Sequence, residues 1–112
     1  MTSRDWLSEI DQLVLLALVH VGDGAYGVTV RTEIENRSGR SVSMAAVYSS
    51  LDRLQRTGCV EAWLSDPTPE RGGRAKKHFK VTPAGAAELR AARRGMARMW
   101  EGLEKHPDLR IP

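Results

Sequence analysis

Apolar side chains in the first part of the chain recur with helical spacing. Over residues 6–21 they form one broad stripe with a period of about 3.6 residues, which predicts an amphipathic helix. The stripe consists of Trp6, Leu7, Ile10, Leu13, Val14, Ala17, Leu18 and Val21. The glycines at 22 and 24 end this helix, and a shorter helix is predicted from about Tyr26 to Arg37.

A third helix is predicted to begin after Ser43, a good N-cap, and to end at Gly58, a left-handed C-terminal stop. One face of this helix is apolar and carries Met44, Val47, Leu51 and Leu54, with Tyr48 at its edge. The opposite face is small or charged and carries Ala45, Ala46, Ser49, Asp52, Arg53 and Arg56. The division predicts a helix that packs on a core with one side and leaves the other side free.

Two strand-like segments follow, at residues 59–65 and 77–82, and Phe79 and Val81 should point inward from the second. Pro67 and Pro69 interrupt the chain after the first segment, and Gly72-Gly73 allows it to reverse. We therefore predict an antiparallel β-hairpin with a flexible loop.

Thr82 and Pro83 mark the start of a last helix, with Thr82 as its cap. Apolar residues then follow at alternating steps of about three and four, the a/d spacing of a coiled coil. They are Leu89, Ala92, Met96, Met99 and Leu103. A domain this small cannot bury such a stripe alone, so we predict a homodimer whose interface consists of these residues and Trp100. The alternative is that the helix folds back on the first helix of the same chain.

The chain has 112 residues, enough for one domain with a small core. Hydrophobic residues make up 41% and aromatic residues 5%, which favours a small helical protein over a β-sandwich. The net charge is only +3, but residues 71–80 contain no acid and five bases: Arg71, Arg74, Lys76, Lys77 and Lys80. A local basic stripe of this kind indicates phosphate binding, and the alternative is a solvated charged loop.

Other kinds of site have little support. Cys59 is the only cysteine, so an internal disulfide is impossible and a buried, inert thiol is expected. The three histidines, His20, His78 and His106, lack metal-ligand spacing, and no catalytic triad or carboxylate pair is recognisable. We therefore expect no catalytic residue, no metal and no other cofactor. The apolar run 13–21 is too short to span a bilayer, so we expect a cytoplasmic protein without a membrane partner.

The order of these parts is that of a winged helix-turn-helix, a mainly α fold with a small β-hairpin. We assign this fold to residues 5–82 and a C-terminal dimerisation helix to residues 83–106. In such a fold the third helix enters the major groove of double-stranded DNA, and the hairpin with its loop, the wing, lies beside it.

Small side chains on the third helix would approach the edges of the DNA bases, and arginine and lysine side chains on the helix and the wing would bind phosphates. The predicted DNA contacts are Ser43, Ala45, Ala46, Tyr48, Ser49, Arg53 and Arg56 on the helix and Arg71, Gly73, Arg74, Lys76 and Lys77 on the wing. The rival interpretation is a winged helix that contacts another protein and binds no DNA.

Five short motifs stand in a characteristic order between about residue 10 and residue 90. They are Leu15-Leu16-Ala17-Leu18, Ala25-Tyr26-Gly27, Val47-Tyr48-Ser49-Ser50-Leu51-Asp52-Arg53-Leu54 with Gly58, Gly73-Arg74 with Lys76-Lys77-His78-Phe79, and Val81-Thr82-Pro83-Ala84-Gly85. In this combination the chain resembles the PadR-type bacterial transcriptional regulators of the short kind, which have a single C-terminal helix. Ser49 replaces a proline that is common in the family, and His78-Phe79 replaces a frequent pair of aromatic residues.

The resemblance implies a homodimer that represses transcription by occupying a pseudopalindromic DNA operator. It also implies that a flat apolar effector could bind between the subunits, near aromatic residues of the first and last helices. In this chain Trp6, Met96 and Trp100 could form such a site. The alternative is that these side chains only pack the dimer.

Overall fold

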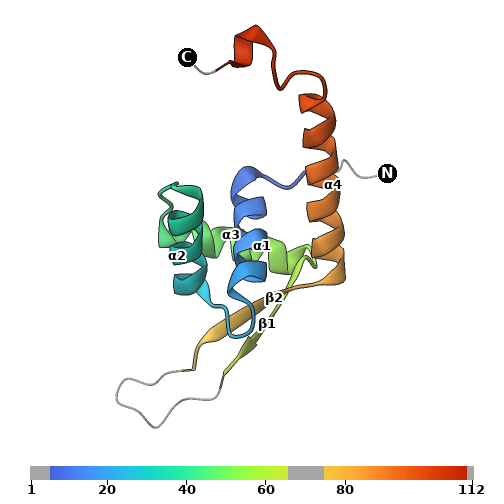
Figure 1. Cartoon of the computed structure of the whole chain (residues 1–112). Coiled ribbons are helices and arrows are strands. Elements are labelled where there is room, and N and C mark those ends of the chain that lie inside the picture. Colours follow the sequence, from blue (N-terminus) through green and yellow to red (C-terminus); the bar gives the residue numbers. More distant parts are fainter. Residues whose placement is uncertain (1–5, 66–74, 111–112) are drawn as a thin grey trace.

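A computed structural model of the chain describes residues 6–65 and 75–110. These residues form four α-helices, a two-stranded antiparallel sheet and a short 3₁₀ helix (Figure 1). In chain order the elements are α1 (Glu9–Val21), α2 (Gly27–Ser38), α3 (Met44–Arg56), β1 (Val60–Leu64), β2 (Lys77–Val81), α4 (Pro83–Trp100) and η1 (Pro107–Leu109).

Hydroxyl side chains cap three of the helices at the N-terminus. The Oγ atom of Ser43 accepts a hydrogen bond from the amide of Ala46, and the Oγ1 atom of Thr82 accepts one from the amide of Gly85, each at 3.0 Å. These starts of α3 and α4 confirm the sequence prediction. For α1 the cap is Ser8, so the helix begins at Glu9 and Trp6, where the predicted apolar stripe starts, lies before it.

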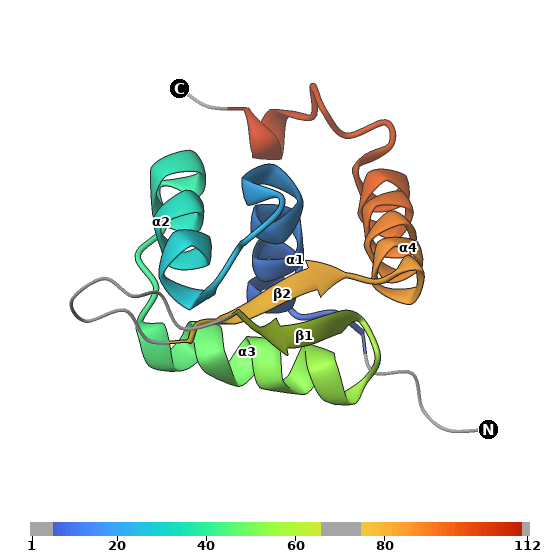
Figure 2. The same ribbon diagram turned by 90° about the horizontal axis from the view of Figure 1, so that it is seen from below.

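The core lies where α1, α2 and α3 meet the inner face of the hairpin. Figure 2 shows α1 between α2 and α4, with α3 running across the ends of these helices. The most deeply buried apolar side chains come from all four parts: Val14, Leu15, Val30, Val47, Leu51, Leu54, Val60 and Phe79. Because one helix face or one strand face from each element closes this core, the winged helix-turn-helix prediction is confirmed.

The hairpin is fixed to the helices at its base. Val60 pairs with Val81 and Leu64 with Lys77 in an antiparallel register. The amide of Phe79 also donates to the carbonyl oxygen of Ala25 at 3.0 Å, which joins β2 to the segment before α2. The predicted inward direction of Phe79 is confirmed, since only 3% of its surface is exposed, and Val81 packs partly buried against the same core.

The start of α4 is packed tightly against the turn between α3 and β1. Gly85 is buried, and a Cβ atom at this position would collide with the backbone carbonyl oxygen of Cys59. The amide of Thr82 donates to the same oxygen at 3.0 Å. From this joint α4 runs along the side of α1 that lies away from α2 (Figure 2).

The end of α4 differs from the sequence prediction. The helix ends at Trp100 and not at residue 106, because Glu101 has an extended backbone (ψ 124°) and Gly102 a left-handed one (φ 81°). These angles interrupt the helical hydrogen bonds. Leu103 therefore lies beyond the helix whose stripe it was predicted to continue. No helix in the described part of the chain is long and apolar enough to cross a membrane.

Candidate nucleic-acid interface

The two faces of α3 differ as the sequence predicts. Val47, Leu51 and Leu54 are buried, whereas Met44 is only half-buried. On the other side Ala45, Ser49 and Arg56 are exposed, and Ala46 and Arg53 are partly exposed. The free face of α3 is thus small in its first half and basic in its second half.

Tyr48 joins α3 to the start of α2. A Cβ atom added to Gly27 would lie 2.5 Å from the Cζ and Oη atoms of Tyr48, so only a glycine lets the ring rest there. Tyr48 nevertheless keeps 48% of its surface exposed. The ring is therefore held by packing, and its outer part remains open to solvent.

A buried carboxylate connects α1 to α3. Asp11 is 6% exposed and accepts three hydrogen bonds from α3. Ser50 Oγ lies 2.7 Å from Asp11 Oδ1, Arg53 Nη2 lies 2.6 Å from the same oxygen, and Arg53 Nε lies 3.2 Å from Oδ2. These bonds fix the orientation of α3 relative to α1.

Asp11 is ionised at neutral pH in the folded chain. Burial by itself raises the pKa of Asp11, but hydrogen bonds from Arg53 and Ser50 and the nearby guanidinium charge outweigh it, so the pKa lies below its ordinary value. The hydrogen bond to Asp11 raises the pKa of Arg53. Sequence reasoning missed Asp11, although Val14 and Leu18 follow it at helical spacing, which places an acid in line with buried positions.

The described part of the wing carries two exposed lysines next to aromatic rings. Lys76 Nζ lies 4.4 Å from the ring centroid of Tyr26, and Lys77 Nζ lies 5.6 Å from that of Phe79. Tyr26 directly precedes Gly27, against which Tyr48 packs, so the part of the wing that carries Lys76 lies near the first half of α3. The predicted contacts Arg71, Gly73 and Arg74 lie outside the described residues.

The free face of α3 and the described part of the wing carry more basic than acidic side chains that reach solvent. Two arginines of α3, Arg53 and Arg56, and two wing lysines contribute cations. The acid on the free face of α3, Asp52, lies 3.5 Å from Arg56 with both side chains 68% exposed, a pair too solvated to hold either group firmly. Such a surface attracts a phosphate backbone and leaves small side chains to meet base edges.

A groove of about 610 Å³ runs between α4 and the segment that leads into α1. It is lined by Trp6, Leu7, Gln12, Glu88, Ala91, Ala92, Gly95, Met96 and Met99. Trp6 is 84% exposed, Met96 60% and Met99 72%. The structure thus brings together Trp6 and Met96, two of the three predicted effector residues, whereas Trp100 does not line the groove.

Some of the predicted dimer residues line this groove and others do not. Ala92, Met96 and Met99 line the groove, and Leu89 packs against the core of its own chain. Trp100 is at the end of α4 and 46% exposed. The partly exposed Ala92 and the exposed Met96 and Met99 therefore form one apolar strip.

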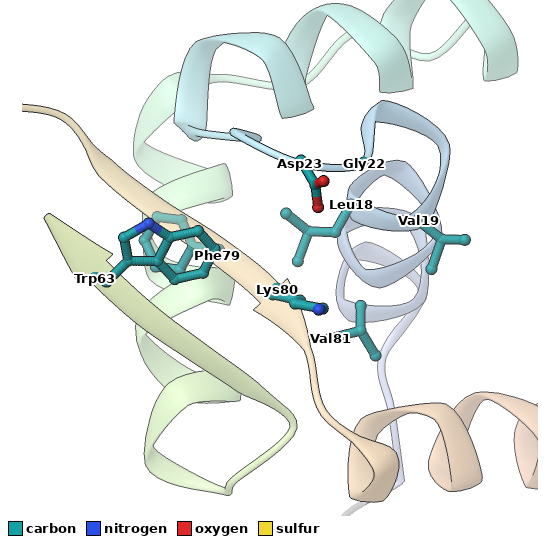
Figure 3. Close-up of a pocket in the computed structure, with 8 residues that line it drawn as sticks. All are labelled: Leu18, Val19, Gly22, Asp23, Trp63, Phe79, Lys80 and Val81. Atoms are coloured by element: carbon teal, nitrogen blue, oxygen red, sulfur yellow. The ribbon is translucent and has the colours of Figure 1, made fainter. Parts of the chain in front are cut away.

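A second hollow, of about 220 Å³, lies between the end of α1 and the hairpin (Figure 3). It is lined by Leu18, Val19, Gly22, Asp23, Trp63, Phe79, Lys80 and Val81. None of these residues is a predicted DNA, dimer or effector residue, although Lys80 belongs to the basic stripe 71–80. The described residues contain no group of three or more His, Cys, Asp or Glu side chains that could hold a metal ion.

Comparison with known proteins supports the same fold. A model of the transcriptional regulator PadR-like family matches residues 15–91, and a search of curated proteins found no match. A transcriptional regulator from Clostridium thermocellum superimposes with a TM-score of 0.72 at 18% identity, over 88% of this chain and 89% of that one.

Two further solved structures are similar. For a PadR family transcription regulator from hypervirulent Clostridium difficile the TM-score is 0.67 at 21% identity, over 84% of this chain and 96% of that one. For a protein from Streptococcus mutans it is 0.66 at 20% identity, over 98% of both chains. At these identities the structures show a shared fold.

Proposed function

Because the chain belongs to the PadR-like family of DNA-binding transcriptional regulators, we propose that it is a homodimeric repressor that occupies a pseudopalindromic operator. Members of this family regulate transcription and are not enzymes. One observation carries the proposal: the free face of α3 is small in its first half and basic in its second, and Lys76 of the wing lies against Tyr26, next to the glycine on which Tyr48 of α3 packs.

The chemistry of this surface suits the major groove. Ala45 and Ala46 could contact thymine methyl groups, and the hydroxyl of Ser49 could donate to a base edge or accept from it. Arg53 and Arg56 lie further along α3, where phosphates would flank the groove. Lys76 and Lys77 would bind the backbone beside it, which orients the protein without selecting sequence.

The exposed strip on α4 supports the dimer. Met96 and Met99 are long apolar side chains that stay largely in solvent in the single chain, and a second copy would bury them. A two-fold dimer presents two copies of α3, so the half-sites of the operator should lie about one helical turn, roughly 34 Å, apart.

Footprinting and gel-shift titration on the DNA upstream of the protein's own gene test this function. A symmetrical protected site with two half-sites, bound at least about a thousandfold more tightly than random DNA, is the expected result. Equal affinity for every sequence would contradict it. A lack of any DNA binding would favour the rival interpretation, a winged helix that contacts another protein.

The groove supports a second element of the proposal, release by a small apolar effector. Its walls combine the indole of Trp6 with Met96 and Met99 and leave space for a planar ring. An effector releases DNA only if it prefers the conformation that binds DNA poorly. In a screen of planar aromatic dyes, a true effector should change tryptophan fluorescence saturably and lower operator affinity. Trp6→Ala should abolish both effects, and a dye whose binding leaves operator affinity unchanged would not be an effector.

A further inference from the structure

We propose that Asp11 of α1 is a positioning residue for DNA binding, because it holds the guanidinium of Arg53 in the orientation that presents the free donors to a DNA phosphate. The inference rests on the proposed function and deepens it. It assigns a task in DNA recognition to an acidic side chain that is buried behind the interface and touches no DNA.

The geometry of the pair leaves one edge of the guanidinium free. Asp11 binds the edge formed by Nε and Nη2, at 3.2 and 2.6 Å. A guanidinium has five N–H donors in a rigid planar fork, so the edge formed by Nη1 and the second N–H of Nη2 remains available. The side chain of Arg53 is 42% exposed and that of Asp11 only 8%, which places the free edge on the solvent side.

The carboxylate of Asp11, which orients Arg53, is itself fixed by hydrogen bonds. Ser50, a fully buried residue, donates to Asp11 Oδ1, and Arg53 occupies both oxygens. With both oxygens engaged, rotation of the carboxylate would break at least one of these bonds. Arg53 is therefore ordered before DNA arrives, and the entropy that a free arginine would lose on binding a phosphate is already lost.

Arg56 provides a contrast on the same helix. Its partner Asp52 is as exposed as the arginine itself, and the two groups lie 3.5 Å apart. This pair does not fix the guanidinium of Arg56. Of the two arginines on the free face of α3, only Arg53 has a buried partner.

The charge of Asp11 would have the opposite effect if it acted alone. A carboxylate next to Arg53 partly cancels the attraction between that arginine and a phosphate. If neutralisation were its only effect on binding, Asp11→Asn would strengthen DNA binding. If orientation dominates, the same change weakens binding. The direction of the effect therefore separates the two roles.

The test is a double-mutant cycle on operator affinity, measured by fluorescence anisotropy with the wild type, Asp11→Asn, Arg53→Gln and the double variant. We expect Asp11→Asn to weaken binding about tenfold, the size of one lost charge-assisted contact. In the Arg53→Gln background the same change should alter affinity less than about twofold. Both single variants should lower the slope of log affinity against log salt by about one.

Two further variants keep the test interpretable. Ser50→Ala removes one hydrogen bond to Asp11 and preserves both charges, so it should weaken binding in the same direction but less, even if Asp11→Asn folds poorly. Glu33→Gln makes the same charge change at an exposed ion pair with Arg37 on α2, and it should leave affinity within about twofold. Circular dichroism at the assay temperature establishes that each protein is folded.

The outcomes separate the two proposals. If the wild type binds no DNA, the proposed function and this inference both fail. If the wild type binds its operator but Asp11→Asn binds as tightly or more tightly, the inference fails and the function stands. The inference also fails if Asp11→Asn weakens binding by the same factor with and without Arg53, because its effect then does not pass through that arginine.

Discussion

Asp11 occupies a position in α1 that helical spacing assigns to the core, since Val14 and Leu18 follow it on the same face and are buried. A lone carboxylate there would be strongly destabilising. Three hydrogen bonds from Ser50 and Arg53 of α3, together with the charge of Arg53, offset that cost and keep the pKa of Asp11 below its ordinary value. A single acidic residue thereby links the stability of the fold to the geometry of α3, the helix proposed to face DNA.

Asp11→Asn should lower the free energy of unfolding at pH 7 by about 2 kcal/mol. Breaking a buried ion pair costs about 3–5 kcal/mol, and the half-exposed arginine reduces this value. Because the pKa of Asp11 is lower in the folded than in the unfolded chain, its contribution is present at neutral pH. It is lost as the pH falls from about 5 through the folded-state pKa.

Urea denaturation of both proteins at pH 7 and pH 3 measures this effect. The difference in stability between wild type and variant should be smaller at pH 3. A difference that stays constant between the two pH values would mean that the charge of Asp11 does not stabilise the fold.

At the scale of elements, the joint between α4 and the turn before β1 depends on one glycine. Gly85→Ala should lower the free energy of unfolding by about 1–3 kcal/mol, because the new Cβ atom would meet the backbone oxygen of Cys59, which cannot rotate away. Gly95→Ala in the same helix is the matched control. Apart from its chain neighbours and the backbone of its own helix, no atom of the described chain lies within 4 Å of a Cβ atom there, and alanine favours a helix over glycine by about 0.5–1 kcal/mol.

Thermal unfolding at equal protein concentration measures both glycine variants. We expect opposite shifts in the melting temperature, downward for Gly85→Ala and upward for Gly95→Ala. If both variants melt as the wild type does, the joint is looser than the packing indicates.

The wing is the second element that can be tested alone. Lys76→Ala and Lys77→Ala should each weaken binding to operator and random DNA by about the same factor, and each should lower the salt slope by about one. Filter-binding titrations between 50 and 300 mM salt, on the order of the physiological range, supply the slopes. Unchanged slopes in both variants would remove these lysines from the interface.

The elements also show how far the sequence alone could predict the structure. Caps are local signals, so Ser43 and Thr82 correctly marked the starts of α3 and α4. The apolar stripes were predicted to run from Trp6 and on to Leu103, because apolar spacing alone does not show where a helix begins or ends. The structure begins α1 after Ser8 and ends α4 before the left-handed Gly102. The pairing of Asp11 with Arg53 joins residues 42 positions apart, and it depends on how α1 crosses α3, which no local pattern encodes. The DNA contacts themselves remain predictions.

At the scale of the whole molecule, the chain is more extended than a compact domain. Its radius of gyration is 16.7 Å, whereas a compact chain of this length would have about 13 Å. The hairpin and the far half of α4 project from the body (Figure 1). Exposed methionines on α4 and the exposed Trp6 are what a second subunit would cover.

Met96→Glu should disrupt the proposed dimer, because two carboxylates would lie in an apolar contact without partners. Operator affinity should fall by at least about a hundredfold, since a single half-site supplies only part of the contacts. Sedimentation velocity and anisotropy measure the two effects. Arg94→Gln, which makes the same change in net charge on the opposite side of α4, should leave both unchanged. A dimeric Met96→Glu protein would show that subunits associate elsewhere.

The contact between Gly85 and the carbonyl oxygen of Cys59 involves backbone atoms, so side-chain changes further along α4 do not alter it. Residues after Leu89, the last residue of α4 that packs against the core, are therefore free to change their apolar pattern while α3 and the wing keep their places. After gene duplication, one copy could acquire a new α4, stop pairing with its parent and still recognise the same DNA. The choice of partner, made by α4, and the choice of operator, made by α3 and the wing, would then evolve independently, because Gly85 joins the two parts through backbone contacts.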